Sequence, residues 1–573
     1  MSKGGAVYSR SAKSIKLTPQ IKARFNIDKT QVTPNELLMA LLKSEVDLIW
    51  NGGIGTYVKA AAENNAEVGD RANDALRVNG RELRCKVFGE GGNLGMTQRG
   101  RIEFSLRGGQ CNTDFIDNAA GVDCSDHEVN IKILLNKEVS AGRLSLAKRN
   151  KFLASMTDTV ADLVLHNNAR QTQAISLAMH RSDQQHAEYQ RFMTWMEETG
   201  QLDPELEFLP TDEQLNERIN RNQTVWTRPE LSVLICYSKV MLKEALFEAD
   251  LSEPWLAKSV NAAFPAQLIA RYGEAVADHQ LRHEIIGTQL ANDLVDRMGF
   301  SFFFRQMEST GASVEEVVRA YSIVMNVLAI DKLWVAIETD ATLAADVQLD
   351  LLHMLIRLVR RTTRWFLRNR RSNLDCTNII KQFAQPMDRL VQQQLARDEA
   401  EWLRLWAAEK DALVARQVEP QLAARLAASD SIFLSLGIVD TAIKQAVSIE
   451  KSASLYFTLG EYLSLDWFMA QIVGLQPDNR WQDLARESYV DDLESQRRRL
   501  TASLLAINTS KPQAVFNDWQ VQQQPLIVRW QSMVRDLRRG TTPDFAMISV
   551  ALRELLDLVQ ASVEASQTAN KSG

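Results

Sequence analysis

The chain has 573 residues, of which 45% are hydrophobic and 24% are charged, and its formal net charge is −6 at pH 7. This composition is typical of a folded globular protein of two to four domains, and the small charge argues against binding to nucleic acid. The basic N-terminal residues are not followed by an apolar run, so we expect no secretory signal, and no apolar run reaches the ~18 residues that a membrane-spanning helix needs. The five cysteines show no CxxC spacing, so we expect reduced thiols and a cytoplasmic protein.

The first quarter of the chain alternates short apolar runs with small turns. Most of the 26 glycines lie at or before Gly142, whereas all of the 12 tryptophans except Trp50 lie beyond it. The apolar runs at 45–50, 85–89 and 114–117 each end in a turn that contains asparagine, and helical candidates follow at 57–66 and 97–107. Repetition of strand, turn and helix predicts a parallel α/β sheet over 1–142.

The remainder of the chain has the periodicity of helices, with apolar residues three and four positions apart. The segments with this pattern are 143–197, 229–250, 285–298, 314–340, 345–371, 385–428, 483–507 and 543–566. We therefore predict an α/β part followed by a mainly α domain over 143–560. A polar, proline-containing break at 199–229 divides that domain into possible subdomains, and the polar tail at 561–573 is expected to be disordered.

Three asparagines mark the ends of the predicted strands: Asn51, Asn93 and Asn118. Ligands of parallel sheets bind outside the carboxyl ends of the strands, and an asparagine offers both a donor and an acceptor to a carboxamide or a ribose hydroxyl. The complete GxGxxG fingerprint is absent, since the GxG at 53–55 and the one at 89–91 lack the third glycine. A nucleotide crevice and ordinary strand-end turns both remain open on this pattern.

A dense polar cluster, Cys124 to Glu128, invites interpretation as a metal site. It has no second pair of ligands at a suitable spacing, so we do not predict a metal there. Ser125 and Glu128 stand three residues apart before an apolar helical run, which is the pattern of a capping box. We therefore predict that a helix starts at Ser125, with its free amides suited to an anionic group.

Six arginines form a stripe on one face of the helix predicted over 345–371. The sequence favours a solvated or salt-bridged face, with docking of an acidic neighbour as the alternative. The arginines are Arg357, Arg360, Arg361, Arg364, Arg368 and Arg371.

Several long motifs resemble the large, NAD-specific class of bacterial glutamate dehydrogenases. The clearest are GEGGNLGMTQRGRIEF at 89–104 and NTDFIDNAAGVDCSDHEVNIKILLN at 112–136. Further stretches match in the same order at 4–15, 46–60, 227–239 and 283–313. The resemblance covers most of the chain and is looser beyond residue 400.

The resemblance implies a partial Rossmann-like NAD domain followed by a large helical domain. The family oxidises L-glutamate to 2-oxoglutarate and ammonia and passes the hydride to NAD. By analogy with the EGAN-type and NAGGV-type motifs of smaller glutamate dehydrogenases, Asn93 and Asn118 would face the nicotinamide-ribose end of the cofactor, and Asn51 and Gly52 would line the same crevice. Ser125 falls where the smaller enzymes place a serine near the side-chain carboxylate of the substrate.

The resemblance also implies that the reactive lysine and aspartate of the family lie upstream of this sequence. We therefore expect the C-terminal portion of the enzyme, with no catalytic residue assigned, inactive alone, and associated with the N-terminal part or with copies of itself. The changes at Ala120 and at 94–96 relative to the smaller enzymes leave the contacts to the cofactor open. A non-catalytic regulatory or oligomerisation module is the alternative.

Overall fold

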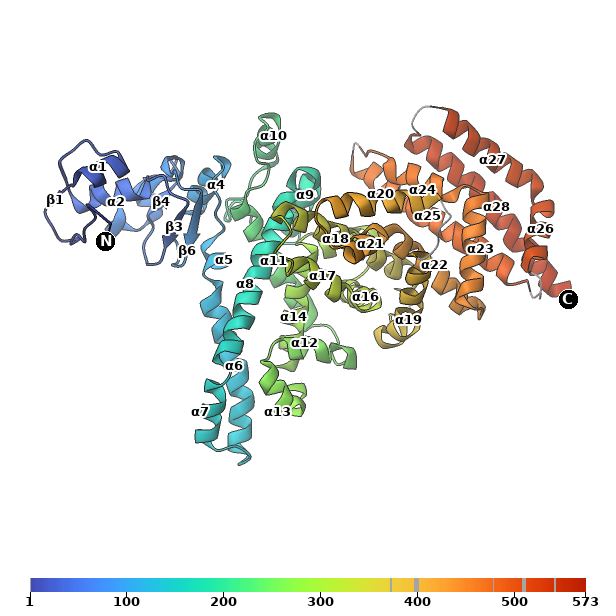
Figure 1. Ribbon diagram of the computed structural model, residues 1–573, viewed down its shortest axis with the longest axis horizontal. Helices are drawn as coiled ribbons and strands as arrows, with labels where there is room; N and C mark the ends of the chain where they lie inside the picture. The colour runs from blue at the N-terminus through green and yellow to red at the C-terminus, as the bar shows by residue number, and fades with distance from the viewer. Residues whose placement is uncertain are drawn as a thin grey trace. The chain divides into compact units, whose positions relative to one another are not determined.

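A computed structural model describes residues 2–371, 374–395, 401–477, 479–507, 512–540 and 543–572. The chain forms two compact units, residues 1–305 and 306–573. The predicted division between an α/β part and a helical part at 142/143 falls inside the first unit and stays a prediction. Helices dominate the described residues, and the short strands all lie near the N-terminus (Figure 1).

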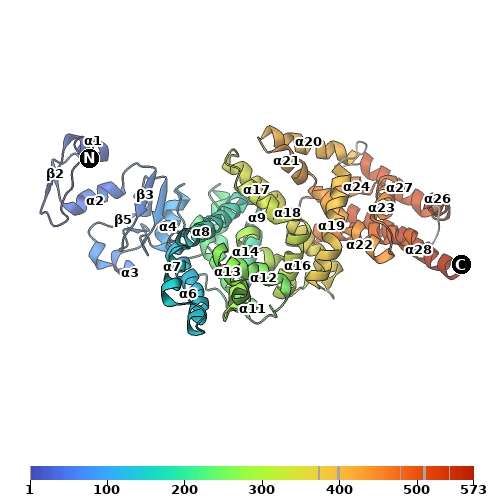
Figure 2. The ribbon, with the colours of Figure 1, turned by 60° about the horizontal axis from the view of Figure 1, so that its bottom comes forward.

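The first unit begins with three two-stranded sheets within its described residues. β1 (Ile15–Lys16) pairs antiparallel with β2 (Gln31–Val32) around α1 (Pro19–Phe25), and Figure 2 shows these elements beside α2 (Pro34–Leu42). β3 (Leu48–Asn51) pairs in parallel with β6 (Val87–Glu90), and β4 (Val58–Lys59) with β5 (Val78–Asn79). Short helical segments at Asn65–Val68, Arg71–Asn73 and Gly80–Glu82 and the helix α4 (Gln98–Leu106) complete this α/β part.

A small apolar core holds the parallel strands against α4. Val58 of β4, Phe88 of β6 and Phe104 of α4 are all buried in one cluster with neighbouring aliphatic and cysteine side chains. The helix α4 starts at its predicted place because the Thr97 hydroxyl accepts a hydrogen bond from Gly100 N at 3.0 Å. The predicted strands at 45–50 and 85–89 and the helix at 97–107 are thus confirmed, and the two strands are parallel neighbours as expected.

Two predictions in this part are wrong. The run 114–117 is a short helix, α5 (Asp114–Asp117), because its two carboxylates, three residues apart, bind the end of β6 and the loop that follows it. The range 57–66 contains β4, and its helix begins only at Asn65. Residues with high strand propensity and a parallel partner at 78–79 override the helical spacing there.

Helices make up the rest of the first unit. α6 (Ala119–Ser140) runs beside α8 (Thr157–His180). α7 (Leu146–Ala154), which lies between them in sequence, is at one end of this helix pair (Figure 1). α8 also packs on α11 (Arg228–Phe247) and α14 (Arg282–Met298). The predicted break at 199–229 lies between α9 (Ser182–Glu198) and α11, and it contains α10 (Asp212–Asn220). The unit continues through Pro254–Leu256, α12 (Ala257–Ala262), α13 (Ala266–Ala277) and into α15 (Phe302–Thr310).

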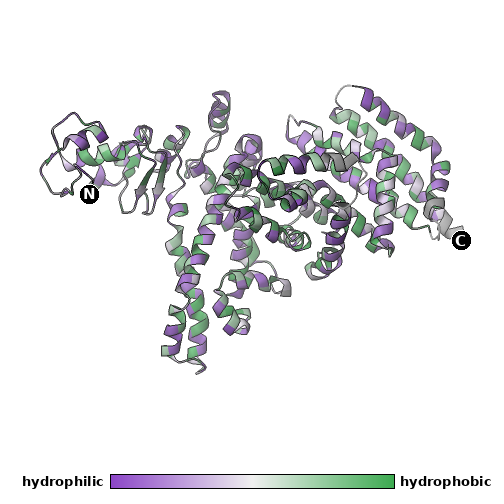
Figure 3. Ribbon diagram, in the orientation of Figure 1, coloured by the Kyte–Doolittle hydropathy of each residue, from purple (hydrophilic) through white to green (hydrophobic). Residues whose placement is uncertain are grey.

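The second unit is helical throughout its described residues. Its helices are amphipathic, with hydrophilic and hydrophobic residues in each (Figure 3). The long α25 (Arg480–Leu505) packs on α28 (Phe545–Ser572) and on α22 (Ser429–Gln445). The other helices are α16 (Val314–Val327), α17 (Ile330–Glu338), α18 (Ala345–Asn369), α19 (Cys376–Leu395), α20 (Glu401–Ala415), α21 (Pro420–Ala427), α23 (Ile449–Tyr462), α24 (Leu465–Gly474), α26 (Pro512–Gln522) and α27 (Gln524–Arg539).

The helix α28 continues through Ser572, and the disorder expected at 561–573 stays a prediction. Ser562 and Ser566 are buried, so this face packs although it carries few large apolar residues. Within the ranges given above, no single helix is long and apolar enough to cross a membrane. Two bent helix pairs, Val314–Val327 with Ile330–Glu338 and Pro420–Ala427 with Ser429–Gln445, meet that criterion only in combination.

Candidate functional site

The three asparagines predicted to line a crevice lie at the carboxyl ends of β3 and β6 and at the end of α5. Asn51 is the last residue of β3, and its carbonyl accepts a hydrogen bond from Gly92 N at 3.0 Å. The side-chain amide of Asn118 donates to Oδ1 of Asn93 at 2.6 Å. Asn51, Asn93 and Asn118 thus come from three neighbouring segments, and Gly52 is exposed beside them.

Glycines allow the loop after β6 to lie against the loop after β3. A Cβ atom on Gly92 would run into the backbone oxygen of Gly53, and one on Gly95 would run into the side chain of Asn51. Between them Leu94 adopts a φ of 53°, in the left-handed region, and its side chain is exposed. The two loops therefore touch through backbone atoms, and side chains at these positions would separate them.

The side-chain amide nitrogen of Asn51 is buried and has no hydrogen-bond partner within the part of the chain that the structure describes. A buried donor without an acceptor costs free energy, which a ligand oxygen would recover. The glycine-lined backbone and this free donor fit a polar group with an acceptor, such as a carboxamide or a sugar hydroxyl. The residues present are therefore compatible with the nicotinamide-ribose end of a dinucleotide.

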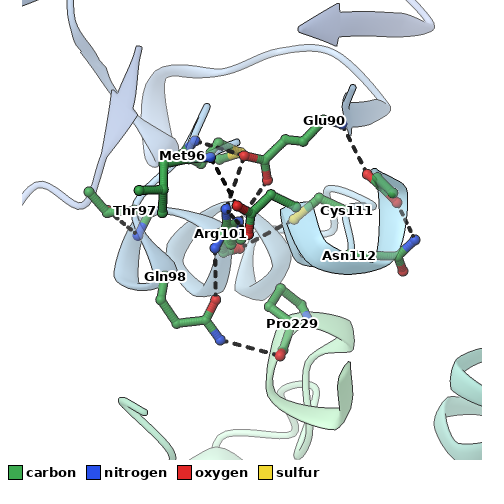
Figure 4. Close-up of polar contacts among 12 residues, drawn as sticks. Glu90, Met96, Thr97, Gln98, Arg101, Cys111, Asn112 and Pro229 are labelled. Carbon is green, nitrogen blue, oxygen red and sulfur yellow. Dashed lines mark hydrogen bonds and ion pairs between the residues drawn. The ribbon is translucent and has the colours of Figure 1, made fainter. Parts of the chain in front are cut away.

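A buried ion pair joins α4 to the end of β6, where the loop that carries Asn93 begins (Figure 4). Glu90 ends β6 and is fully buried, and Arg101 of α4 reaches its two carboxylate oxygens at 2.7 and 3.0 Å. Glu90 also accepts a hydrogen bond from Met96 N at 3.0 Å, so it closes the loop across residues 91–95. Burial alone would lower the pKa of the Arg101 guanidinium, but the hydrogen bonds and charge of Glu90 outweigh it and raise that pKa.

The two carboxylates of α5 hold the same loop from its other side. Asp114 accepts hydrogen bonds from Arg101 and from Leu94 N, both at 2.9 Å. Asp117 accepts one from Glu90 N at 3.0 Å and one from the Asn112 side chain at 2.8 Å. Burial raises the pKa of the Asp117 carboxyl above its ordinary value, although these hydrogen bonds oppose the shift.

The predicted start of a helix at Ser125 is wrong. The helix α6 already begins at Ala119, immediately after α5, so Ser125 lies in its second turn. The Ser125 hydroxyl is exposed and donates to Gly121 O at 3.0 Å, as a mid-helix serine does. Its backbone amide is therefore not among the free amides of a helix start, and Glu128 pairs with Lys132 instead of returning to Ser125.

The side chains of the polar cluster at 124–128 do not converge. His127 is buried and its Nδ1 lies 3.0 Å from Ala263 O, whereas Cys124 is exposed. Within the described ranges, no group of three metal-ligating side chains is found. The cluster therefore offers a metal ion no set of ligands in this structure.

The arginine stripe of α18 lies in the second unit. Its arginines form salt bridges, which confirms the favoured prediction of a solvated or salt-bridged face. Its arginines reach acidic side chains on α16, α22 and α25, so they bind helices of their own unit. The pairs are Arg361 with Asp430, Arg364 with Glu487, Arg368 with Asp491 at 3.0 Å and Arg371 with Glu316 at 3.0 Å.

Sequence reasoning missed the residues that hold the asparagine loops in place. They are Glu90, Gln98, Arg101, Asn112, Asp114, Asp117 and Arg228. A local signal existed only for the last of them: the run TRPE at 227–230 has the spacing of a capping box around a helix start. The other partners are far apart in sequence, and their side-chain types are common on any surface.

Two family models match the chain. The model described as "Bacterial NAD-glutamate dehydrogenase, catalytic domain" matches residues 1–178, and the model described as "Glutamate dehydrogenase, C-terminal" matches residues 223–557. All the residues of the site except Arg228 lie in the first match, and Arg228 lies in the second.

Curated relatives with the name "NAD-specific glutamate dehydrogenase" align with nearly the whole chain. The relative from Pseudomonas aeruginosa is 48% identical over 566 residues, which are 98% of this chain and 35% of the relative. The one from Halomonas elongata is 44% identical over 569 residues, with 99% and 35% covered. The one from Mycobacterium tuberculosis is 35% identical over 580 residues, with 98% and 35% covered. The chain thus spans about a third of the length of these relatives.

Proposed function

This chain belongs to the family of bacterial NAD-specific glutamate dehydrogenases, and we propose that its α/β part forms one wall of an NAD crevice in an enzyme that oxidises L-glutamate to 2-oxoglutarate and ammonia. In this proposal β3 and β6 belong to a larger Rossmann-like sheet. The observation that carries it is the hydrogen bond between Asn93 and Asn118, together with the side-chain amide of Asn51, which lies against Gly95 of the same loop and has no partner among the described residues.

The asparagine pair would hold and orient the cofactor. Its mutual hydrogen bond uses the amide of Asn118 and the oxygen of Asn93, which leaves the oxygen of Asn118 and the amide of Asn93 for a ligand. One acceptor and one donor at this place match a carboxamide group. NAD, when bound, supplies the acceptor for the hydride that leaves the α-carbon of glutamate.

Ser125 remains the proposed contact to the side-chain carboxylate of glutamate, on the family resemblance. Its hydroxyl is exposed and would exchange its bond to Gly121 O for the ligand. We also propose that the enzyme is cytoplasmic and oligomeric. The described residues hold the five cysteines as thiols rather than as disulfides, which is compatible with a reducing compartment.

Titration of the purified chain with NAD by isothermal calorimetry tests the cofactor site. We expect measurable binding, and we expect Asn118→Ala to raise Kd about fivefold, the value of one hydrogen bond of about 1 kcal/mol. Asn220→Ala, an exposed asparagine at the end of α10, is the matched control and should leave Kd unchanged. Equal affinities of the wild type and Asn118→Ala would remove Asn118 from the site.

Glutamate-dependent reduction of NAD, followed by absorbance, tests turnover. We propose that the purified chain gives none, because the family resemblance assigns the acid–base step to none of its lysines. Steady turnover by the purified chain would overturn the proposal that it is inactive alone. Self-association of the chain together with no binding of NAD would instead support a regulatory or oligomerisation module.

A further inference from the structure

The N-terminal end of α11 is joined to the end of β6 by a relay of side chains through α4 (Figure 4). The carbonyl of Pro229 accepts a hydrogen bond from the Gln98 amide at 3.2 Å. The other end of Gln98 accepts one from Arg101 at 3.2 Å, and Arg101 in turn holds the Glu90 carboxylate. Gln98 donates at one end and accepts at the other, and Arg101 carries the charge that holds Glu90, so three contacts link the start of α11 to Glu90.

A second relay starts one residue earlier in α11. Arg228 donates through Nε to Oδ1 of Asn112 at 2.9 Å. The Asn112 amide donates to one oxygen of Asp117 at 2.8 Å, and the other oxygen of Asp117 accepts from Glu90 N at 3.0 Å. This relay runs through α5 and reaches the backbone of Glu90, whereas the first reaches its side chain.

The two relays meet at the residue that shapes the asparagine loop. Glu90 precedes the loop and binds Met96 N at the loop's far end, with Asn93 between them. Asp117, in the second relay, is the neighbour of Asn118. The loop that carries Asn93 and the helix end that carries Asn118 are therefore both held by groups that the two relays connect to α11.

Several contacts hold the start of α11 in place, so it can serve as a rigid support for the two relays. Thr227 and Glu230 form a capping box, with Thr227 N donating to the fully buried Glu230 carboxylate at 2.8 Å. Arg218 of α10 binds the same carboxylate at 2.8 Å. Pro229 adds a fixed backbone angle in the first turn. These contacts leave the start of α11 little freedom to shift.

Arg228 has the features of a positioning group rather than of a structural ion pair. Its guanidinium donates to three neutral oxygens, those of Asn112, of the Ser176 hydroxyl at 3.1 Å and of the Thr172 backbone at 3.5 Å. Burial lowers its pKa below the ordinary arginine value. A desolvated guanidinium held only by neutral acceptors gains little stability from its charge, so its directed donors are the feature that matters.

We propose that Arg228 and Gln98 are positioning residues through which the start of α11, in the C-terminal family segment, sets the geometry of the Asn93–Asn118 pair in the catalytic segment. The effect on cofactor binding rests on the proposed NAD role of that pair. The effect on the loop itself does not, and the two are measured separately below.

Hydrogen exchange of the purified chain, followed by mass spectrometry without any ligand, tests the relay directly. Arg228→Met removes the donors of the side chain and keeps its approximate length. We therefore expect faster exchange in peptides covering 88–96, whose amides at Glu90 and Leu94 bind the α5 carboxylates, and in peptides covering 112–118, which carry those carboxylates. Arg228→Lys, which retains a single donor nitrogen, should restore part of the protection. Arg282→Met is the matched control, since Arg282 of α14 also donates to a neutral oxygen, Leu251 O at 3.0 Å.

Calorimetric titration with NAD then tests the link to the pair. We expect Arg228→Met and Gln98→Met each to raise Kd about fivefold. In the Asn118→Ala background Arg228→Met should have little further effect, because residues that act through one another are not additive. Unchanged exchange at 88–96 and 112–118 would overturn the relay. Altered exchange with no binding of NAD by the wild type would contradict the proposed function and leave the relay standing, and additive effects on Kd would refute action through Asn118.

Discussion

Replacing Arg101 by methionine tests whether the ion pair at the end of β6 holds the α/β part together. The Arg101 side chain is 3% exposed, and those of its partners Glu90 and Asp114 are 0% and 13% exposed. The substitution removes three charge-assisted hydrogen bonds, at 2.7, 3.0 and 2.9 Å, and leaves a fully buried carboxylate without its counter-ion. Removing one member of a buried pair costs about 3–5 kcal/mol. We expect the free energy of unfolding of the α/β part to fall by that amount.

The double variant Glu90→Leu/Arg101→Met separates the free-energy cost of an unpaired buried charge from the cost of lost packing. It removes the carboxylate together with the guanidinium, so we expect it to be about 1–3 kcal/mol more stable than Arg101→Met alone. Burial raises the pKa of Glu90, and in the single variant Arg101 no longer opposes that shift. The folded form then binds a proton more tightly than the unfolded form, so the deficit of Arg101→Met should shrink as the pH falls from about 8 to about 5.

Urea titrations followed by hydrogen exchange of peptides from β3 and β6 measure these free energies locally, since a whole-chain signal mixes two compact units. The reasoning is refuted if Arg101→Met stays within about 1 kcal/mol of the wild type. It is also refuted if the double variant is less stable than the single one, or if the deficit grows towards acidic pH.

Three further predictions concern stability and thiol reactivity. Gly92→Ala should destabilise the α/β part by about 1–3 kcal/mol in urea titrations, because its Cβ meets the backbone oxygen of Gly53, whereas Gly121→Ala, in open space on α6, should be neutral or stabilising by up to about 1 kcal/mol. Phe88→Ala should cost about 3–5 kcal/mol in the same assay, since that ring is 1% exposed in the core, and a loss below about 1 kcal/mol would contradict the packing. With a chromogenic thiol reagent at about pH 8, one thiol should react quickly and Cys124→Ser should abolish that phase, because Cys124 is exposed while burial raises the pKa of Cys236 to about 11. Reaction of the slow thiols should quicken as the pH rises.

The sequence alone predicted many of the helices and the first pair of parallel strands. Apolar spacing along the chain predicts α4, α11, α14, α18 and α25, and hydrogen bonds of such helices are local, so the pattern and the caps suffice to place them. The asparagine turns after β3 and β6 were also visible, because glycine and asparagine favour such turns for reasons of local backbone geometry. Their convergence followed from the rule that the ends of parallel strands share one edge of a sheet.

Only the tertiary structure decided what the acidic residues of 114–117 do. The run DFID has an apolar centre that a strand or a helix could bury, and a short segment of this kind has no decisive periodicity. Asp114 binds the loop after β6 and Asp117 binds Glu90 at the end of that strand, and a helical turn is the conformation that brings two residues three apart to one side. The helix α6 begins directly after α5 at Ala119, so Ser125 is a mid-helix residue.

The tertiary structure likewise decided which charged residues matter. Arg101 and Glu90 are eleven positions apart in sequence, and Arg228 reaches Asn112 over 116 positions. No local rule links such partners, because a buried ion pair or relay depends on where two independently folded segments meet. The asparagines could be predicted from the local sequence, whereas the groups that hold them in place are determined by tertiary packing.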